Sequence, residues 1–136
     1  EMGLPISVAI LDIDHFKRLN DRHGHDGGDK ALTAVARTLG VMAERGFNLL
    51  ARIGGEEFAI IFPGADLDEA ERLCGDIRAA IAGAPLVING ETLPLTVSIG
   101  VAALAPDAML ETCLGQADEA LYVAKQDGRD RVRTAA

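Results

Sequence analysis

The stretch that most constrains this sequence is Arg52–Phe58, in which two glycines are followed by two adjacent glutamates. Apolar residues lie on both sides of it: Phe47, Leu49, Leu50 and Ala51 before, and Ala59, Ile60, Ile61 and Phe62 after. Two strand-like runs joined by Gly-Gly predict a β-hairpin, because glycine adopts the positive φ angles of such a turn at little cost. An acidic surface turn is the simple interpretation of Glu56 and Glu57. Their like charges repel without a neutralising neighbour in the sequence, so a functional site is the alternative.

Length and charge narrow the class of protein. We expect the 136 residues to form one domain with a core of Ala, Leu, Ile and Val, since 49% of them are hydrophobic and only 4% are aromatic. The sequence has no apolar run of about 18 residues, so direct membrane insertion is not expected. A net charge of −8 argues against a general nucleic-acid or membrane-surface binder. It does not exclude a small anionic ligand held by a few local cations and a metal.

The two cysteines, Cys74 and Cys113, fall on the apolar faces of predicted helices. Such positions favour buried, reduced thiols, with a disulfide or a catalytic thiol as the alternative. Reduced cysteines fit a cytoplasmic location.

The apolar periodicity predicts strands that alternate with helices along the whole chain. In the first half we expect a strand over residues 6–13, a short helix from His15 to Asp21 that Asp14 caps and that ends near Gly24, a helix over 26–44, and then the opening hairpin. A helix from a capping Asp66 to Gly83 and a hairpin turn at Asn89-Gly90 follow. The last elements are a half-buried strand over 93–101, a helix over 109–126 and a short edge strand at 131–133. This order predicts an α+β sandwich of the ferredoxin-like or palm type, in which helices flank a central antiparallel sheet of about five strands with a small extra hairpin.

In such a fold the end of the first strand lies beside the opening hairpin. Asp12 and Asp14 would then approach Glu56 and Glu57. Crowded carboxylates repel one another unless a cation neutralises them, and oxygen ligands favour Mg²⁺, with Mn²⁺ as a possible substitute. Magnesium in such sites usually serves phosphate groups. Strand alternation predicts that Glu56 and Glu57 point to opposite faces and play different roles.

Cations and amide groups for a phosphorylated ligand are present nearby in the predicted fold. Lys17, Lys125 and Arg129 are candidates for phosphate contacts, with solvated surface charges as the alternative interpretation. Asn20 and Asp29 offer hydrogen-bonding groups that suit the edge of a base, and helix capping is the alternative for both.

Five spaced motifs together resemble the GGDEF domain of diguanylate cyclases, over nearly the whole chain and in the same order. They are Asp12-Ile-Asp14-His-Phe-Lys17-Arg-Leu-Asn20-Asp21, Gly24-His25-Asp26-Gly-Gly-Asp29, Arg52-Ile-Gly-Gly-Glu-Glu-Phe58, Thr96-Val-Ser-Ile-Gly100 and Ala117-Asp118-Glu-Ala-Leu-Tyr122-Val-Ala-Lys125-Gln-Asp-Gly-Arg129.

The resemblance implies that two GTP molecules condense to cyclic di-GMP and release two pyrophosphates. Asp12, the backbone carbonyl of Ile13 and Glu56 match the positions that hold Mg²⁺. Glu57 matches the second acid of the signature, which is assigned to metal binding or to activation of the 3′-hydroxyl. Glu56, Glu57 and Lys17 are therefore the expected catalytic residues.

The resemblance also implies a substrate-binding set. Asn20 and Asp29 match guanine contacts, and Lys17, Lys125 and Arg129 match phosphate contacts. An aspartate at position 29 favours GTP over other purine nucleotides.

Three further positions complete the expected substrate site. Phe16 matches a residue that contacts the nucleotide. Gly54 and Gly55 match glycines that let the backbone approach it closely.

One such site holds one GTP and has no acceptor, so catalysis is expected to require a homodimer with two sites facing each other. The family normally carries a further N-terminal helical segment, which this chain lacks, and an upstream sensory domain is the expected partner. Family members often have an inhibitory product site, Arg-x-x-Asp. Here Arg45 is followed by Asn48, which lacks the acidic charge, so we expect weak product binding.

Three functions remain open from the sequence. The first is an active cyclase domain, which the intact acids favour. The second is a module that binds GTP or cyclic di-GMP and regulates a partner without turnover. The third is a structural dimerisation domain whose acids are only solvated. Incubation with GTP and Mg²⁺ followed by product analysis separates them.

Overall fold

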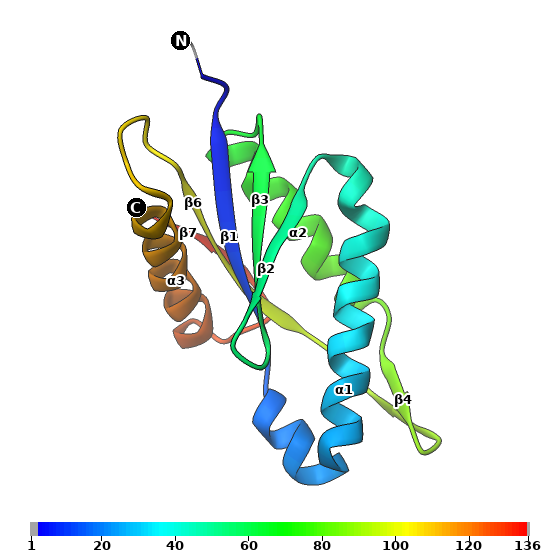
Figure 1. Cartoon of the computed structure of the whole chain (residues 1–136). Helices are drawn as coiled ribbons and strands as arrows, with labels where there is room; N and C mark the ends of the chain where they lie inside the picture. The colour runs from blue at the N-terminus through cyan, green and yellow to red at the C-terminus, as the bar shows by residue number, and fades with distance from the viewer. Residues whose placement is uncertain (1–2, 136) are drawn as a thin grey trace.

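The structure is a computed structural model that describes residues 3–135, shown in Figure 1. Its elements in chain order are β1 (Ile6–Ile13), α1 (Phe16–Met42), the 3₁₀ helix η1 (Ala43–Arg45), β2 (Asn48–Ile53), β3 (Glu57–Pro63), α2 (Leu67–Ala82), β4 (Leu86–Ile88), β5 (Glu91–Leu93), β6 (Val97–Ala103), α3 (Leu110–Gln126) and β7 (Val132–Thr134). Helices lie on both faces of a sheet, as Figure 1 shows, and the predicted α+β sandwich is confirmed.

The five-stranded sheet has the order β2-β3-β1-β6-β7, with β1 at its centre. β1 pairs antiparallel with β3 on one side and with β6 on the other. The short edge strand expected at 131–133 forms as β7, but it pairs parallel with β6, so the sheet is mixed. β4 and β5 form a separate hairpin around Asn89 and Gly90, which both have positive φ as predicted.

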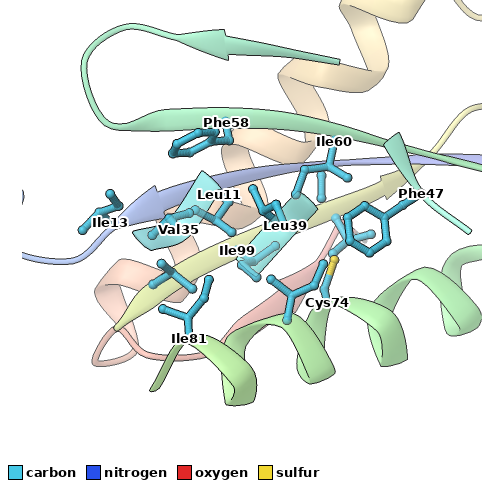
Figure 2. Packing of buried hydrophobic residues seen from close by; sticks show 14 of the residues in the cluster. Leu11, Ile13, Val35, Leu39, Phe47, Phe58, Ile60, Cys74, Ile81 and Ile99 are labelled. Carbon is cyan, nitrogen blue, oxygen red and sulfur yellow. The ribbon is translucent and has the colours of Figure 1, made fainter. Parts of the chain in front are cut away.

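Side chains of β1 alternate between two apolar clusters. Ala9, Leu11 and Ile13 face the larger cluster, to which α1 and α2 contribute, and Figure 2 shows its packing. Val8 and Ile10 face the smaller cluster under α3. Because helices cover both faces, the central strand is apolar at successive positions, which is the pattern that a two-sided burial requires.

The prediction of a half-buried strand over 93–101 was wrong in two respects. Leu93 belongs to β5, and the chain leaves regular pairing at Pro94 before β6 begins at Val97. β6 is buried on both faces from Val97 to Ala102. Gly100, a small residue in this strand, is buried because the backbone of α3 packs directly on it.

Some of the helix boundaries follow the predicted local signals, and one does not. α1 consists of two helical pieces joined at Gly24, whose φ of 72° and ψ of −177° interrupt the helix, as predicted. The Asp66 side chain accepts a hydrogen bond of 2.9 Å from the Glu69 backbone N–H at the start of α2. The cap predicted at Asp14 was wrong: His15 occupies that position in the left-handed region, without a side-chain cap.

The opening hairpin forms between β2 and β3, but its turn contains three residues, Gly54, Gly55 and Glu56, where two were predicted. Ile53 pairs with Glu57 across this turn. Gly54 has a φ of 63°, which glycine adopts without a steric penalty. Glu56 therefore belongs to the turn, and strand alternation does not by itself decide where it points.

Cys74 on α2 and Cys113 on α3 are buried free thiols, as predicted. Burial raises the pKa of the Cys74 thiol above its ordinary value, which keeps it protonated and unreactive. Over residues 3–135, the helices are too short or too polar to cross a bilayer.

Candidate functional site

Strand register brings the first predicted acid to the hairpin. Asp12 near the end of β1 lies directly opposite Glu57, the first residue of β3. The backbone N–H of Ile13 donates a hydrogen bond of 3.3 Å to the carbonyl of Glu56 in the turn. The predicted proximity of the end of the first strand to the tip of the hairpin is therefore confirmed.

A cleft of about 170 Å³ opens at this junction. Its lining combines the predicted metal ligands with all three predicted phosphate contacts: Asp12, Ile13, Asp14, His15, Phe16, Lys17, Glu56, Lys125 and Arg129. β1, the first piece of α1, the hairpin turn and the end of α3 each supply part of this lining. Residues from both ends of the sequence thus surround a single small, polar cavity.

Asp12 is the most buried acid of the site, with 3% of its surface exposed. Its carboxylate forms an ion pair with the Lys125 ammonium, which reaches it from the last turn of α3. Burial raises the pKa of Asp12 above its ordinary value, although the paired Lys125 opposes the shift. Asp12 is thus a desolvated carboxylate with one cation beside it and room for a second on the cleft side.

The two glutamates occupy different environments. Glu56 lines the cleft, and burial together with the Asp12 charge raises its pKa. Glu57 lies close enough to α3 that Asp118 affects it, and its pKa is raised by burial and then by the charges of Asp12 and Asp118. Repulsion among these acids disfavours their charged forms, and a bound cation would relieve it.

The donor set fits a magnesium ion that arrives with a phosphorylated ligand. Within residues 3–135 no three His, Cys, Asp or Glu side chains form a closed metal cage. Mg²⁺ usually binds through one or two carboxylates and completes its coordination with water and substrate phosphates. Asp12, Glu56 and the Ile13 carbonyl in the cleft provide that kind of partial site.

Asn20 and Asp29 lie on the two pieces of α1. The Asn20 side chain packs over Gly28, where an added Cβ would lie 2.0 Å from its Oδ1 atom. That oxygen is buried and has no hydrogen-bond partner among the described residues, as expected of an acceptor kept for a ligand. Asp29 is exposed and borders a larger groove of about 490 Å³ between α1 and residues 84–87. The structure therefore keeps Asp29 outside the cleft around Asp12.

The glycines of the hairpin turn face open space. A Cβ added at Gly54 or Gly55 would meet no atom within 4 Å in the described chain. The positive φ of Gly54 explains glycine at that position. Neither packing nor a positive φ requires glycine at position 55, and the turn is open to solvent there.

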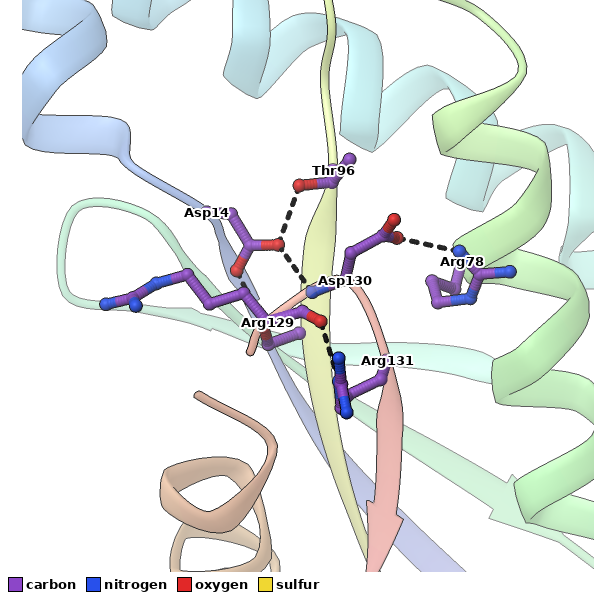
Figure 3. A network of polar contacts seen from close by, with 7 residues as sticks. Asp14, Arg78, Thr96, Arg129, Asp130 and Arg131 are labelled. Carbon is purple, nitrogen blue, oxygen red and sulfur yellow. Dashed lines mark hydrogen bonds and ion pairs between the residues drawn. The ribbon is translucent and has the colours of Figure 1, made fainter. Parts of the chain in front are cut away.

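Asp14 lines the same cleft as Asp12 and Glu56, and its charge helps to raise the pKa of Asp12, but its own oxygens already accept hydrogen bonds within the protein. Its Oδ1 accepts a hydrogen bond of 2.6 Å from Ser98, and its Oδ2 accepts bonds of 2.7 Å from Thr96 and 3.0 Å from the Asp130 backbone N–H. Figure 3 shows this network. The sequence alone assigned Thr96 and Ser98 no role, although both hydroxyls fall at alternate positions of the strand predicted over 93–101, which was the available signal.

Arg45 lies apart from the cleft, at the end of η1. Its guanidinium forms an ion pair of 2.6 Å with Asp76 of α2, and both side chains are about half exposed. Asn48 follows at the start of β2 and is exposed. The predicted inhibitory position thus contains an arginine that already has an acidic partner, contributed by a helix that the sequence alone did not connect to it.

Comparison with known proteins gives consistent results. The family model described as "Diguanylate cyclase, GGDEF domain" matches residues 1–131. Diguanylate cyclase DgcP of Pseudomonas aeruginosa is 42% identical over 98% of this chain and 20% of its own length. Response regulator PleD of Caulobacter vibrioides is 41% identical over 96% of this chain and 29% of its own length. The crystal structure of the GGDEF domain of DgcB from Caulobacter crescentus in complex with c-di-GMP superposes with a TM-score of 0.90 at 39% identity, covering 96% of this chain and 78% of that one. The chain thus spans less than a third of the length of both curated relatives.

Proposed function

Because this chain belongs to the GGDEF domain family of diguanylate cyclases, we propose that it condenses two GTP molecules into cyclic di-GMP and releases two pyrophosphates. The observation that carries the proposal is the cleft at the junction of β1 and β3. There, two desolvated carboxylates with raised pKa values, Asp12 and Glu56, adjoin the cationic groups of Lys17, Lys125 and Arg129, and a third, Glu57, lies opposite Asp12 just outside the lining. This combination suits a ligand that brings both a divalent cation and several phosphate groups.

The residues of the cleft would have two different roles, metal binding and phosphate binding. Asp12, the Ile13 carbonyl and Glu56 would hold Mg²⁺, which neutralises phosphate charge and orients the displacement. Lys17, Lys125 and Arg129 would bind the triphosphate. Since Lys125 is paired with Asp12, it keeps a buried carboxylate neutralised before the substrate enters.

Glu57 is the proposed general base. In each displacement the 3′-hydroxyl oxygen of one GTP forms a bond to the α-phosphorus of the other, and the bond from that phosphorus to pyrophosphate breaks. The hydroxyl proton passes to the Glu57 carboxylate. Its raised pKa makes it a stronger base than an exposed glutamate would be, and its position outside the cleft lining suits a group that faces the second nucleotide.

Asn20 and Asp29 would contact guanine, and Phe16, Gly54 and Gly55 would lie against the nucleotide. The Asn20 Oδ1 atom has no hydrogen-bond partner among the described residues, which supports a role as acceptor for an N–H group of the base. Neither Asn20 nor Asp29 contributes to the cleft around Asp12, so the base would extend from the cleft toward the two pieces of α1.

The proposed reaction needs two copies of the domain. A single cleft holds one GTP, and the acceptor hydroxyl must come from a nucleotide in a second cleft that faces it. We propose a homodimer as the active form. We further propose that residues 1–136 are one domain of a longer cytoplasmic protein in which an N-terminal sensory domain controls dimerisation.

We expect this chain to convert GTP to cyclic di-GMP in the presence of Mg²⁺, with a specific activity that rises with protein concentration. The rise follows because only the dimer contains both nucleotides of the reaction. Liquid chromatography and mass spectrometry of the products over a wide protein range measure it. GTP binding without cyclic product at the highest concentration would contradict the proposal and support a regulatory binding module. Absence of GTP binding would support a structural role.

Cyclic di-GMP is expected to bind weakly at Arg45, with a Kd above about 1 μM. Asp76 already neutralises this arginine, and Asn48 supplies no negative charge to orient it. Titration calorimetry of the wild type, Arg45→Ala and Asp76→Ala measures the effect. Asp76→Ala should tighten binding, because it releases Arg45 for a phosphate. A sub-micromolar affinity in the wild type that Arg45→Ala abolishes would show that the expectation is wrong.

A further inference from the structure

The segment after α3 has an unusual backbone. α3 ends in a Schellman motif, in which Gly128 has a φ of 124° and the Arg129 N–H donates a hydrogen bond of 2.9 Å to the Ala124 carbonyl. Arg129 and Asp130 follow with φ values of 64° and 49°. Consecutive non-glycine residues rarely adopt the left-handed region, because Cβ crowds the backbone there. Contacts from elsewhere in the chain must therefore hold this turn.

Three contacts hold the turn, two of them from distant parts of the chain and one from the neighbouring Arg131. Asp14, just after β1, accepts a hydrogen bond of 3.0 Å from the Asp130 backbone N–H. Arg78 of α2 donates a bond of 2.7 Å to the Asp130 carboxylate. The Arg131 side chain donates a bond of 2.8 Å to the Arg129 carbonyl. Figure 3 shows the Arg129 side chain leaving this turn on the side away from Arg78, and Arg129 lines the cleft.

Asp14 is itself fixed in one orientation. Both of its oxygens accept hydrogen bonds from hydroxyl groups, one from Thr96 just before β6 and one from Ser98 in β6. Ser98 is fully buried, and the backbone N–H of Asp14 donates a further bond of 2.9 Å to the Thr96 carbonyl. A carboxylate whose two oxygens are both fixed by hydroxyl groups provides a rigid acceptor for the Asp130 N–H, and bonds to a charged acceptor are stronger than those between neutral groups.

We propose that Asp14 is a positioning residue that directs Arg129 into the cleft, by holding the left-handed turn at Arg129–Asp130 through the Asp130 N–H. The inference rests on the proposed function, in which Arg129 contacts the phosphates of GTP. Asp14 touches neither the cation nor the nucleotide in this assignment. It acts through the backbone next to Arg129, and Thr96 and Ser98 orient it.

Asp14→Asn tests the proposal. Asparagine keeps one acceptor oxygen, but its amide NH2 group cannot accept, so at least one of the bonds from Ser98, Thr96 and the Asp130 N–H is lost and the others no longer end on a charged acceptor. We expect about tenfold weaker binding of Mg²⁺ with the α,β-methylene analogue of GTP, in line with the loss of a bond to a charged acceptor. The affinity for GMP, which lacks the outer phosphates, should fall by less than about twofold. Titration calorimetry supplies both affinities.

A double-mutant cycle separates positioning from a general structural role. In an Arg129→Ala background, Asp14→Asn should produce no further loss of affinity for the analogue, because the side chain that it positions is gone. Equal losses for the analogue and GMP, or additive losses in the cycle, would overturn the proposal. Thr96→Val, which removes one donor to Asp14, is the milder second variant and should lower affinity for the analogue in the same direction if Asp14→Asn folds poorly.

Asp127→Asn is the matched control. Asp127 is an exposed acid in the same connection, and it pairs with Arg133 at 2.8 Å. Its replacement should leave both affinities unchanged, and a loss as large as that of Asp14→Asn would contradict a specific role for Asp14. If the wild type fails to bind the GTP analogue at all, the proposed function fails first. If the wild type binds the GTP analogue tightly and Asp14→Asn does not change that affinity, only the present inference is contradicted.

Discussion

Replacing Glu57 by glutamine is expected to lower kcat for cyclic di-GMP formation by roughly 10³-fold, the range in which loss of a general base falls. Glutamine has the shape of glutamate but cannot take the proton of the 3′-hydroxyl. The Kd for GTP with Mg²⁺ should change by less than about threefold, because Glu57 lies outside the lining of the cleft. Single-turnover kinetics and equilibrium binding measure the two effects separately.

The same variant should stabilise the domain in metal-free buffer at neutral pH. Because burial and the charges of Asp12 and Asp118 raise the pKa of folded Glu57, ionised Glu57 destabilises the folded state. This destabilisation is absent below the ordinary pKa of glutamate and develops as pH rises through the raised folded value. The melting temperature of Glu57→Gln should therefore exceed that of the wild type at about pH 8, and the difference should shrink at about pH 4.

Glu119→Gln is the matched control, since Glu119 is an exposed acid on α3. Its kcat should equal that of the wild type. Turnover that persists in Glu57→Gln would remove Glu57 from the mechanism. A parallel loss of GTP binding would instead indicate that Glu57 holds the substrate or its cation.

The second large effect is expected at Gly100, where alanine should lower the free energy of unfolding by about 3 kcal/mol, the upper end for an overpacked site. A Cβ at this position would lie 2.0 Å from the Ala117 carbonyl oxygen and 2.2 Å from the Leu121 nitrogen. Both are backbone atoms of α3, so a change of side-chain rotamer cannot relieve the clash. α3 would have to move away from β6, and urea denaturation measures the cost.

That displacement should also weaken substrate binding, because α3 carries Lys125 and leads into Arg129. Gly115→Ala is the control on the same helix, where an added Cβ meets no atom within 4 Å in the described chain. Because glycine disfavours helix interiors, this change should raise the free energy of unfolding by about 0.5–1 kcal/mol. Equal stabilities of Gly100→Ala and the wild type would show that α3 does not rest on β6 at this close distance.

Much of the fold follows from local patterns in the sequence. The break at Gly24, the Asp66 cap and the turn at Asn89 and Gly90 each depend on residues only a few positions apart, whose conformational preferences are intrinsic. Apolar periodicity likewise predicts which face of each helix is buried. The strand order could also be inferred from the sequence, because a hairpin and two strand–helix units leave few ways to form one sheet.

The sequence predicted which residues form the candidate site but not how they are arranged in it. Asp12, Glu56 and Lys125 were all expected near one another, yet the sequence gives no reason for Lys125 to pair with Asp12 rather than remain in solvent. The different surroundings of Glu56 and Glu57 follow from a three-residue turn, where a Gly-Gly link predicted two residues. A shift of one residue in a turn changes which side chains face the cleft.

By itself, the sequence determined the elements, the motifs and the set of acids and cations that gather at the end of β1, because each depends on composition or on spacing of a few residues. Only the tertiary structure decided how these groups are held. Asp14 has hydroxyl partners 82 and 84 residues away and a backbone partner 116 residues away, and these contacts fix its carboxylate in the lining of the cleft. Such contacts depend on the register of β1 against β6 and on where α3 ends above them, and no local pattern in the chain encodes that geometry.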